Sequence, residues 1–281
     1  MPELDSVPEL VEPVMVAAFE GWNDAGEAAS AVIEHLAAAW DTDELLSLES
    51  DDYYDFQVSR PRVETLDGES RRIQWPTTKV SVARPRGGGH DIVLVRGTEP
   101  NMRWRGFCSD LLAVARELGV RRVILLGALL ADAPHTRPVP VTSVASPPEL
   151  GRRLHLEPTT YEGPTGILGV LQEVFGSAGL ETVSLWAAVP HYVAQPPCPK
   201  GTLSLLRRVE DILDVTVPLG DLPEEARAWE HGVNELASED SDIAGYVRSL
   251  EEAKDAAELP EATGEAIARE FERYLKRRGR G

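Results

Sequence analysis

The sequence predicts an α/β protein with a mixed central sheet, because three kinds of pattern follow one another along its 281 residues. Short continuous apolar runs are typical of strands that are covered on both faces. Amphipathic segments of helical period follow several of these runs. One further stretch alternates polar and apolar residues, as antiparallel strands do. We expect an α/β core domain over residues 1–215 and an acidic helical extension over residues 216–281.

The first α/β unit opens the chain. Residues 13–19 form a continuous apolar run, which predicts a buried strand. Asp24 precedes Glu27 by three residues, the spacing of a capping box, in which each side chain accepts a hydrogen bond from the other residue's backbone N–H. The helix that follows is predicted to bury the face formed by Ala25, Ala28, Ala29, Val32, Leu36 and Trp40.

Later segments repeat this order of strand, loop and helix. Strands are expected at residues 91–95, 122–128 and 182–189. A helix after residue 101 is expected to turn inward Phe107, Leu111, Leu112, Ala115 and Leu118. Two more helices are expected at residues 166–175 and 200–213, and Gly119 and Gly176 are typical helix stops.

A different pattern lies between the first two units. Residues 54–63, 71–75 and 79–83 alternate polar and apolar side chains, and Asp67-Gly68 supplies a turn. These segments are predicted to be antiparallel strands that either extend the sheet or form a flap. From Leu222 onward the chain reads as acidic helices, broken near Pro260 and followed by a basic tail over residues 273–281.

The charge is strongly negative and unevenly distributed. The chain has 47 Asp and Glu against 28 Lys and Arg, a formal net charge of −19. Residues 1–59 contain 15 acidic and no basic residues, residues 60–209 contain 13 and 19, and residues 210–281 contain 19 and 9. Because nucleic acids and anionic membranes attract basic surfaces, neither is an expected partner. The acidic C-terminal helices are either a solvated face or a surface for a basic partner, and a basic middle segment between acidic ends favours self-association.

Several features indicate a cytoplasmic protein. The sequence has no run of about 18 apolar residues, so no transmembrane helix is expected. Residues 1–5 lack the basic and apolar regions of a signal peptide. Cys108 and Cys198 are the two cysteines, too few for a disulfide framework.

Polar and aromatic residues gather in the loops that follow the predicted strands, where ligand sites of α/β sheets lie. We expect these loops to converge on one cleft that binds a ligand or a partner. The candidate residues are Trp22, Asn23, Asp24, Arg96, Glu99, Asn101, Arg103, His135, Arg137, Tyr161, Thr165 and His191.

The chemistry of these loops leaves alternatives open. The arginines suit a bound carboxylate or phosphate, or else a fixed salt-bridge network with Glu99, Asp132 and Glu162. His135 and His191 suit acid–base catalysis or a structural role. The aromatic residues suit a protein interface as well as a ligand pocket.

The loop over residues 161–167 opens a helix, whose first N–H groups suit an anion, although its Gly and Pro residues are also those of an ordinary turn. No nucleophile elbow, metal-ligand spacing, Walker loop or dinucleotide fingerprint is present, so neither a metal nor a cofactor is expected and no catalytic residue is assigned.

Five motifs in order resemble the proteasome assembly chaperone 2 family, most closely its actinobacterial branch. They are FEGWNDAG at residues 19–26, RGTEPN at 96–101, LGALLADAPHTRP at 126–138, YEGPTGI at 161–167 and PHY at 190–192. The resemblance implies a three-layer phosphorylase/hydrolase-like fold, similar in shape to purine nucleoside phosphorylases, with a helical C-terminal appendage. It also implies a homo-oligomer, with a trimer favoured, and it transfers no catalytic residue.

The end of the chain departs from the family pattern. Family chaperones that dock on proteasome α-rings end in a hydrophobic residue, a tyrosine and any residue. This chain ends Arg278-Gly279-Arg280-Gly281, and its nearest tyrosine, Tyr274, lies seven residues before the end. We therefore do not expect docking on a proteasome through the tail.

Two functional hypotheses result. The first is a non-enzymatic assembly or scaffold protein that binds itself and other proteins, based on the resemblance and on the missing nucleophile and metal motifs. The second is an enzyme or binding protein for a small anionic metabolite, such as a nucleoside or nucleotide, based on the Arg, His and carboxylate residues of the strand-end loops.

Overall fold

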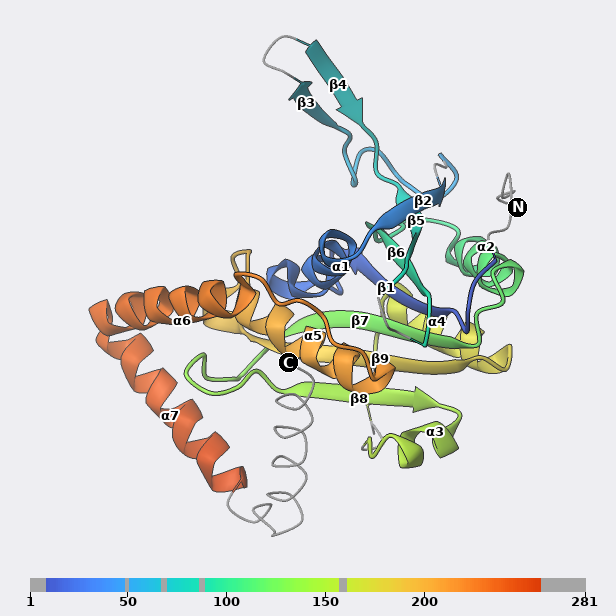
Figure 1. Ribbon diagram of the computed structural model, residues 1–281. Helices are drawn as coiled ribbons and strands as arrows, with labels where there is room; N and C mark the ends of the chain where they lie inside the picture. The colour runs from blue at the N-terminus through green and yellow to red at the C-terminus, as the bar shows by residue number, and fades with distance from the viewer. Residues whose placement is uncertain (1–8, 49–50, 67–69, 86–88, 157–160, 259–281) are drawn as a thin grey trace.

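A computed structural model describes residues 9–48, 51–66, 70–85, 89–156 and 161–258. Its centre is a seven-stranded sheet in the order β2-β5-β6-β1-β7-β9-β8 (Figure 1). The strands are β1 (Val14–Glu20), β2 (Thr42–Ser47), β5 (Thr78–Ala83), β6 (Ile92–Thr98), β7 (Arg122–Ala131), β8 (Val141–Ser146) and β9 (Glu181–Pro190).

The sheet is mixed, as the sequence predicts. Strands β6, β1, β7 and β9 are parallel, and they include the four apolar runs on which the α/β prediction rests. Strands β5 and β2 add antiparallel pairs at one edge, and β8 adds another at the opposite edge. The α/β fold class with a mixed central sheet is therefore confirmed.

Helices cover both faces of the sheet because the side chains of β1 alternate between two cores. Val14, Val16 and Ala18 belong to the core under α1 (Ala28–Ala39) and α5 (Pro199–Leu213). Met15, Ala17 and Phe19 belong to the core under α2 (Trp104–Glu117) and α4 (Ile167–Ser177). The result is the three-layer arrangement in which both faces of a parallel sheet are buried.

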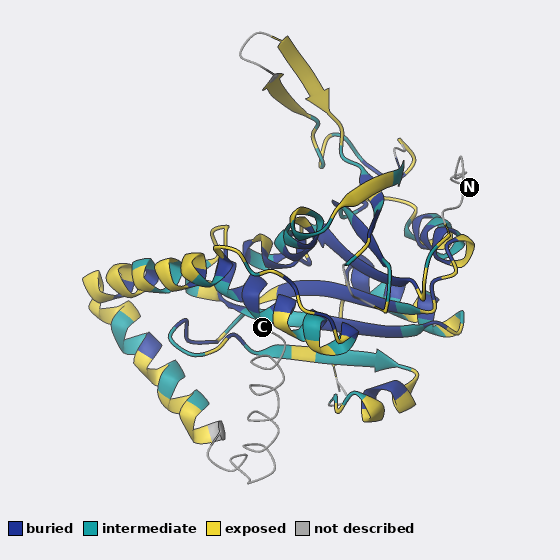
Figure 2. Ribbon diagram, in the orientation of Figure 1, coloured by how far each residue is buried: buried dark blue, intermediate teal, exposed yellow. Residues whose placement is uncertain are grey.

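The stretch of alternating polar and apolar residues both extends the sheet and forms a flap, the two alternatives that the sequence leaves open. Strand β5 extends the sheet, whereas β3 (Arg62–Leu66) and β4 (Ser70–Gln74) form a separate antiparallel hairpin. Figure 1 shows this hairpin projecting away from the sheet, and Figure 2 shows it exposed.

The prediction of a strand over residues 54–63 is wrong for its first part, where the chain turns. Tyr54 is buried there, and its hydroxyl group contacts the Thr78 hydroxyl at 3.0 Å. The side chain fills the core beside β5, and the backbone turns around it instead of pairing.

Two acidic helices follow the core, as predicted from the sequence. Helix α6 (Leu222–Glu239) packs Leu222 and Ala226 on the core under α1 and α5, and α7 (Ser241–Glu258) continues from it (Figure 1). No described helix is both long enough and apolar enough to span a membrane. The predicted turn at Asp67-Gly68, the break near Pro260 and the tail with Tyr274 lie outside the described residues.

Two strands and one α-helix of the described residues were not predicted. Strand β2 and strand β8 lie at the two sheet edges, and α3 (Pro148–Arg153) follows β8. Prolines flank β8 at positions 138, 140 and 147, and proline is a typical sign of a loop. An edge strand tolerates such neighbours because it needs backbone partners on one side only.

Candidate functional site

A cleft of about 1480 Å³ opens at the carboxyl end of the parallel strands. Glu20 at the end of β1, residues 96–98 at the end of β6 and Leu129 and Leu130 near the end of β7 line it. The root of the hairpin, residues 58–62 and 74–77, forms another wall. The cleft therefore lies where ligand sites of α/β sheets are expected.

The rim of this cleft is strongly apolar. Among the described residues, six large apolar side chains line the cleft and are exposed. They are Trp22, Val58, Trp75, Leu129, Leu130 and Tyr161. Trp22 is 67% exposed. Scattered apolar side chains are normal on a protein surface, but a group gathered around one hollow marks a binding surface.

Asp24 fixes the loop that contains Trp22 to the start of α1. The Asp24 carboxylate accepts hydrogen bonds from the backbone N–H of Ala29 at 2.7 Å and of Ser30 at 3.3 Å. The predicted capping box with Glu27 does not form, because Gly26 and Glu27 adopt left-handed backbone angles, with φ of 62° and 52°. This tight turn delays α1 to Ala28, so Asp24 caps N–H groups two residues later than predicted.

Glu99 joins three of the five motif loops. Its Oε1 atom accepts from Asn23 Nδ2 at 2.6 Å and from the backbone N–H of Ile167 at 2.9 Å. Its own backbone N–H donates to the Glu20 carbonyl at 2.8 Å. Ile167 is the first residue of α4, so a carboxylate of the chain itself occupies the helix N-terminus where the sequence suggests an anion.

The candidate arginines are paired within the chain. Arg96 contacts Glu20 at 2.7 Å and Glu34 at 2.6 Å. Arg103, in the loop after β6, contacts Asp52 at 2.7 Å. The carboxylates of these pairs are not the ones named from the sequence, but the arrangement is that of a salt-bridge network.

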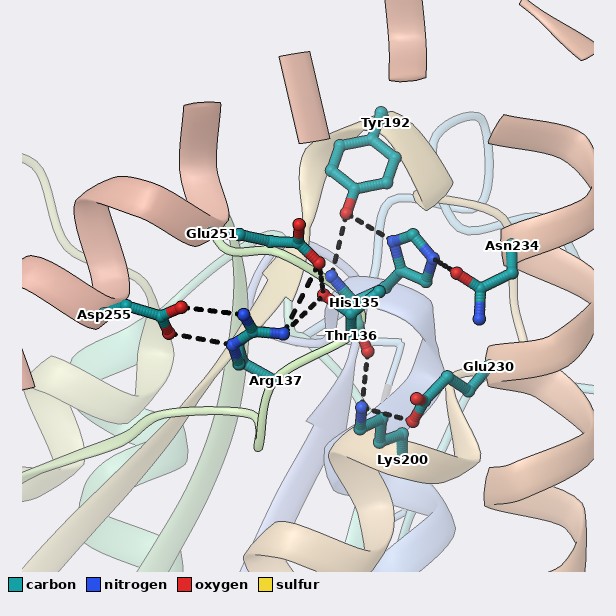
Figure 3. Close-up of polar contacts among 9 residues, drawn as sticks. All are labelled: His135, Thr136, Arg137, Tyr192, Lys200, Glu230, Asn234, Glu251 and Asp255. Carbon is teal, nitrogen blue, oxygen red and sulfur yellow. Dashed lines mark hydrogen bonds and ion pairs between the residues drawn. The ribbon is translucent and has the colours of Figure 1, made fainter. Parts of the chain in front are cut away.

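His135 lies fully buried beneath the C-terminal helices (Figure 3). Its Nε2 atom contacts Asn234 Oδ1 of α6 at 3.0 Å, and its Nδ1 atom contacts the Tyr192 hydroxyl at 2.7 Å. Since an amide oxygen only accepts, Nε2 carries the proton and Nδ1 accepts from Tyr192. Both ring nitrogens are thus occupied, which is the structural role that the sequence left open.

Charged residues also attach α6 and α7 to the rest of the protein (Figure 3). Lys200 of α5 donates to Glu230 of α6 at 2.5 Å and to the His135 carbonyl. Arg137 forms a bidentate pair with Asp255 of α7, at 2.9 and 2.8 Å. Bidentate arginine pairs are the stronger and more directional form of this interaction.

The loop after β9 also reaches α7. His191 contacts Asp132 at 3.3 Å, and the Tyr246 hydroxyl donates to the same carboxylate at 2.9 Å. The His191 and Tyr246 rings meet edge to face at 5.4 Å. His191 and Arg137 therefore belong with His135 in the attachment of the helices.

The twelve candidate residues thus separate into four places. The cleft is lined by Trp22, Asp24, Arg96, Tyr161 and Thr165. Asn23 and Glu99 join the loops, and His135, Arg137 and His191 face the C-terminal helices. Asn101 accepts from the Asp55 backbone N–H at 3.1 Å, near Arg103.

Sequence reasoning missed three apolar residues of the cleft, Leu129, Leu130 and Trp186. Leu129 and Leu130 continue the apolar run of β7, so they read as a buried strand, yet both are exposed. Trp186 of β9 reads in the same way and lines the cleft. The length of the apolar run could have indicated them, because the run continues past Ala128, the last buried residue of β7.

The two cysteines are buried in the cores. Burial raises the pKa of the Cys108 thiol to about 12 and also raises the pKa of Cys198. Because the thiolate is the reactive form, both side chains act as small apolar residues. The described residues contain no group of three or more His, Cys, Asp or Glu arranged to hold a metal ion.

Acidification should weaken the fold through His135. Burial lowers the pKa of this imidazole below its ordinary value of 6.5, and Lys200 adds to the effect, whereas Asn234, Glu230 and Glu251 oppose it. The unfolded chain therefore binds more protons than the folded chain as the pH falls through 6.5. The stability that depends on neutral His135 is present above this pH and is lost below it, by at most about 1.4 kcal/mol per pH unit.

This prediction is checked by thermal unfolding between pH 5 and 8. His135→Gln keeps a donor near Asn234 and should flatten the acid limb of the curve. The control His231→Gln removes an exposed histidine of α6 that contacts the exposed Glu235 at 3.4 Å, and its curve should follow the wild type. Equal acid limbs for all three proteins would contradict the assignment.

Comparisons with known proteins agree with this architecture. A model described as the PAC2 family matches residues 18–237. A PAC2 family protein from Streptomyces avermitilis is 61% identical, with a TM-score of 0.78 over 84% of this chain and 99% of that one. A proteasome-assembly chaperone homologue from Mycobacterium tuberculosis is 54% identical, with a TM-score of 0.77 over 83% and 99%. Pyrococcus furiosus PbaB, an archaeal proteasome activator, shares the fold at 17% identity, with a TM-score of 0.67 over 83% and 97%. No curated protein matches the sequence.

Proposed function

Because this chain belongs to the PAC2 family, we propose that it is a non-enzymatic assembly or scaffold protein that binds other proteins as a homo-oligomer. The proposal includes a cytoplasmic location, a trimer as the favoured assembly and no cofactor. It also treats residues 1–215 as the binding core and residues 216–281 as an appended helical unit.

The apolar rim of the cleft carries the proposal. Trp22, Trp75 and Tyr161 extend from three different segments around one opening and are at least half exposed. Tryptophan and tyrosine are the residues that most often dominate the energy of protein interfaces. An apolar segment of a partner that buries these rings would gain both area and shape complementarity.

The polar candidate residues support the same conclusion because they already bind groups of the chain itself. Asp24 and Glu99 satisfy backbone N–H groups, and Arg96 is held between two carboxylates. A small anion at Arg96 would have to displace Glu20 and Glu34. The alternative, an enzyme or binding protein for a nucleoside, a nucleotide or another small anion, therefore receives less support from this geometry.

Replacing the aromatic rim should abolish partner binding while the fold is retained. Trp22→Ala combined with Trp75→Ala should reduce the recovery of co-purifying proteins at least tenfold, since interface tryptophans each contribute roughly 2 kcal/mol or more. The measurement is purification of tagged protein from its own cells, followed by quantitative mass spectrometry.

The matched control removes two exposed apolar side chains that are not among those lining the cleft, Val11 and Met102. Val11→Ala combined with Met102→Ala should leave the recovered proteins unchanged. Recovery of the self-oligomer alone from the wild type, over several growth conditions, would contradict the proposal. A rise in melting temperature with a nucleoside, a nucleotide or phosphate would favour the alternative, because a ligand of the native state stabilises it.

A further inference from the structure

The projecting hairpin is exposed along its whole described length. Strands β3 and β4 form their own two-stranded sheet, every residue of β4 is exposed, and so are residues 62–65 of β3. An isolated two-stranded hairpin is only marginally stable in water. A hairpin of this kind that carries Val63 and Ile73 more than half exposed is therefore expected to lie against another surface.

The two faces of this hairpin differ. Val63 pairs with Ile73, and Thr65 pairs with Arg71, so these four side chains share one face. Arg62 and Gln74 pair on the opposite face, and both line the chain's own cleft. The face with Val63, Ile73 and Arg71 is here called the arm face, and none of these three residues is among those that line the cleft.

A complementary surface lies on α6. Glu225, Ala228, Gly232, Leu236 and Glu239 recur at intervals of three and four residues, so they share one stripe of the helix. Leu236 is 65% exposed, and a side chain built on Gly232 would meet open space. This set, here called the α6 stripe, is a shallow apolar strip with a carboxylate at each end.

We propose that the arm face of one copy of this chain lies on the α6 stripe of a second copy. Val63 and Ile73 pack over Leu236 and the open space at Gly232, and Arg71 pairs with Glu239. The inference rests on the homo-oligomer of the proposed function and names the surfaces that form it.

Dimensions and charge both favour this contact. A five-residue strand is about 17 Å long, and the fourteen-residue step from Glu225 to Glu239 is about 21 Å. The described strands carry Arg62, Arg71 and Arg72 against Glu64, on a chain whose net charge is −19. Asp67 and Glu69 come between the two strands in the sequence and lie outside the described residues, so the basic character is that of the strands.

The contact forms between copies and not within one. Figure 1 shows the hairpin rising from the β2 and β5 side of the sheet, far from α6. Each copy therefore offers an arm face to one neighbour and an α6 stripe to another. Such a head-to-tail contact closes into a ring when the rotation between copies allows it.

The test is the molar mass of purified full-length protein by light scattering after size exclusion, at micromolar concentration. The wild type should be a discrete oligomer. Ile73→Asp buries a charge in the contact, and Gly232→Trp fills the stripe without meeting a neighbour in its own chain. Each of these variants should be monomeric, with an unchanged circular dichroism spectrum.

A charge reversal tests the pairing directly. Arg71→Glu and Glu239→Arg should each weaken association at least tenfold, and the two changes combined should restore most of it. The control Arg62→Glu makes the same charge change on the opposite face and should keep the wild-type mass.

A monomeric wild type, or oligomers that survive both Ile73→Asp and Gly232→Trp, would overturn the inference. Failure of the double charge reversal to recover association would overturn the Arg71–Glu239 pairing. Trp22→Ala with Trp75→Ala should keep the oligomer while losing other proteins, so failure of the arm contact and failure of partner binding are distinguishable.

Discussion

Glu99→Ala should lower the free energy of unfolding by about 3 kcal/mol, the largest effect that we expect from a polar side chain of the site. The substitution removes a charged acceptor from Asn23 and from the first N–H of α4. It also leaves the amide nitrogen of Asn23, a residue that is 1% exposed, without its acceptor, and an unsatisfied buried polar group costs about 1–3 kcal/mol. For a domain of this size the melting temperature should fall by roughly 6–12 °C.

The matched control is Glu162→Ala. Glu162 belongs to the same motif loop as Tyr161 but is exposed, and surface substitutions of this kind usually stay within about 0.5 kcal/mol. Chemical denaturation of the three proteins gives the comparison. If Glu99→Ala unfolded like Glu162→Ala, Glu99 would not be the residue that joins the loops, and its carboxylate would again be a candidate for binding a ligand.

Gly97→Ala should destabilise the protein by about 2–3 kcal/mol, because there is no room for a Cβ atom. A Cβ at Gly97 would lie 2.3 Å from Thr78 Oγ1 of β5 and 2.6 Å from the carbonyl oxygen of Thr77, the residue before β5. The Thr78 hydroxyl is itself fixed by Tyr54 at 3.0 Å, so the neighbour cannot rotate away freely. Strand β5 would have to move from β6, and the hairpin root that it carries would move with it.

Gly89→Ala is the control for this substitution. A Cβ at Gly89 meets nothing within 4 Å, and a tolerated Gly→Ala change has a small effect, often a stabilising one. Melting temperatures measured by calorimetry distinguish the two variants. A Gly97→Ala protein as stable as the Gly89→Ala protein would show that β5 and β6 tolerate a wider separation than the structure has.

The central layers could be predicted from the sequence because their signal is local. The apolar run of β1 and the periodicity of α1 occur within 30 residues, and each conforms to its own rule. Strand β8 violates its local rule, since proline flanks it and the sheet edge alone permits it. The hairpin was ambiguous because alternation specifies strands without saying which sheet they join.

The site was harder to predict because its partners come from distant parts of the chain. The strand-end rule brought Trp22, Arg96 and Tyr161 to one cleft. The same rule placed His135 there, but Asn234, which occupies its Nε2 atom, lies 99 residues away on α6. The periodicity of α6 predicts a helix, but it does not show that Asn234 contacts a residue in a distant strand-end loop.

The capping residue Asp24 shows a smaller failure of the same kind. The spacing to Glu27 is that of a capping box, and the residue does cap α1. The left-handed backbone of Gly26 and Glu27 changes which N–H groups it reaches, and a spacing rule contains no information on backbone angles.

The most direct test of the protein-binding cleft is site-specific photo-crosslinking in the native cells, with a crosslinking amino acid in place of Trp22 or of Val11. The two positions are 67% and 62% exposed, but only Trp22 lines the cleft. We expect Trp22 to give adducts that contain peptides of another protein, and Val11 to give none of these. Equal adducts from both positions, or none from Trp22 while a nucleoside, a nucleotide or phosphate raises the melting temperature, would contradict a protein-binding cleft.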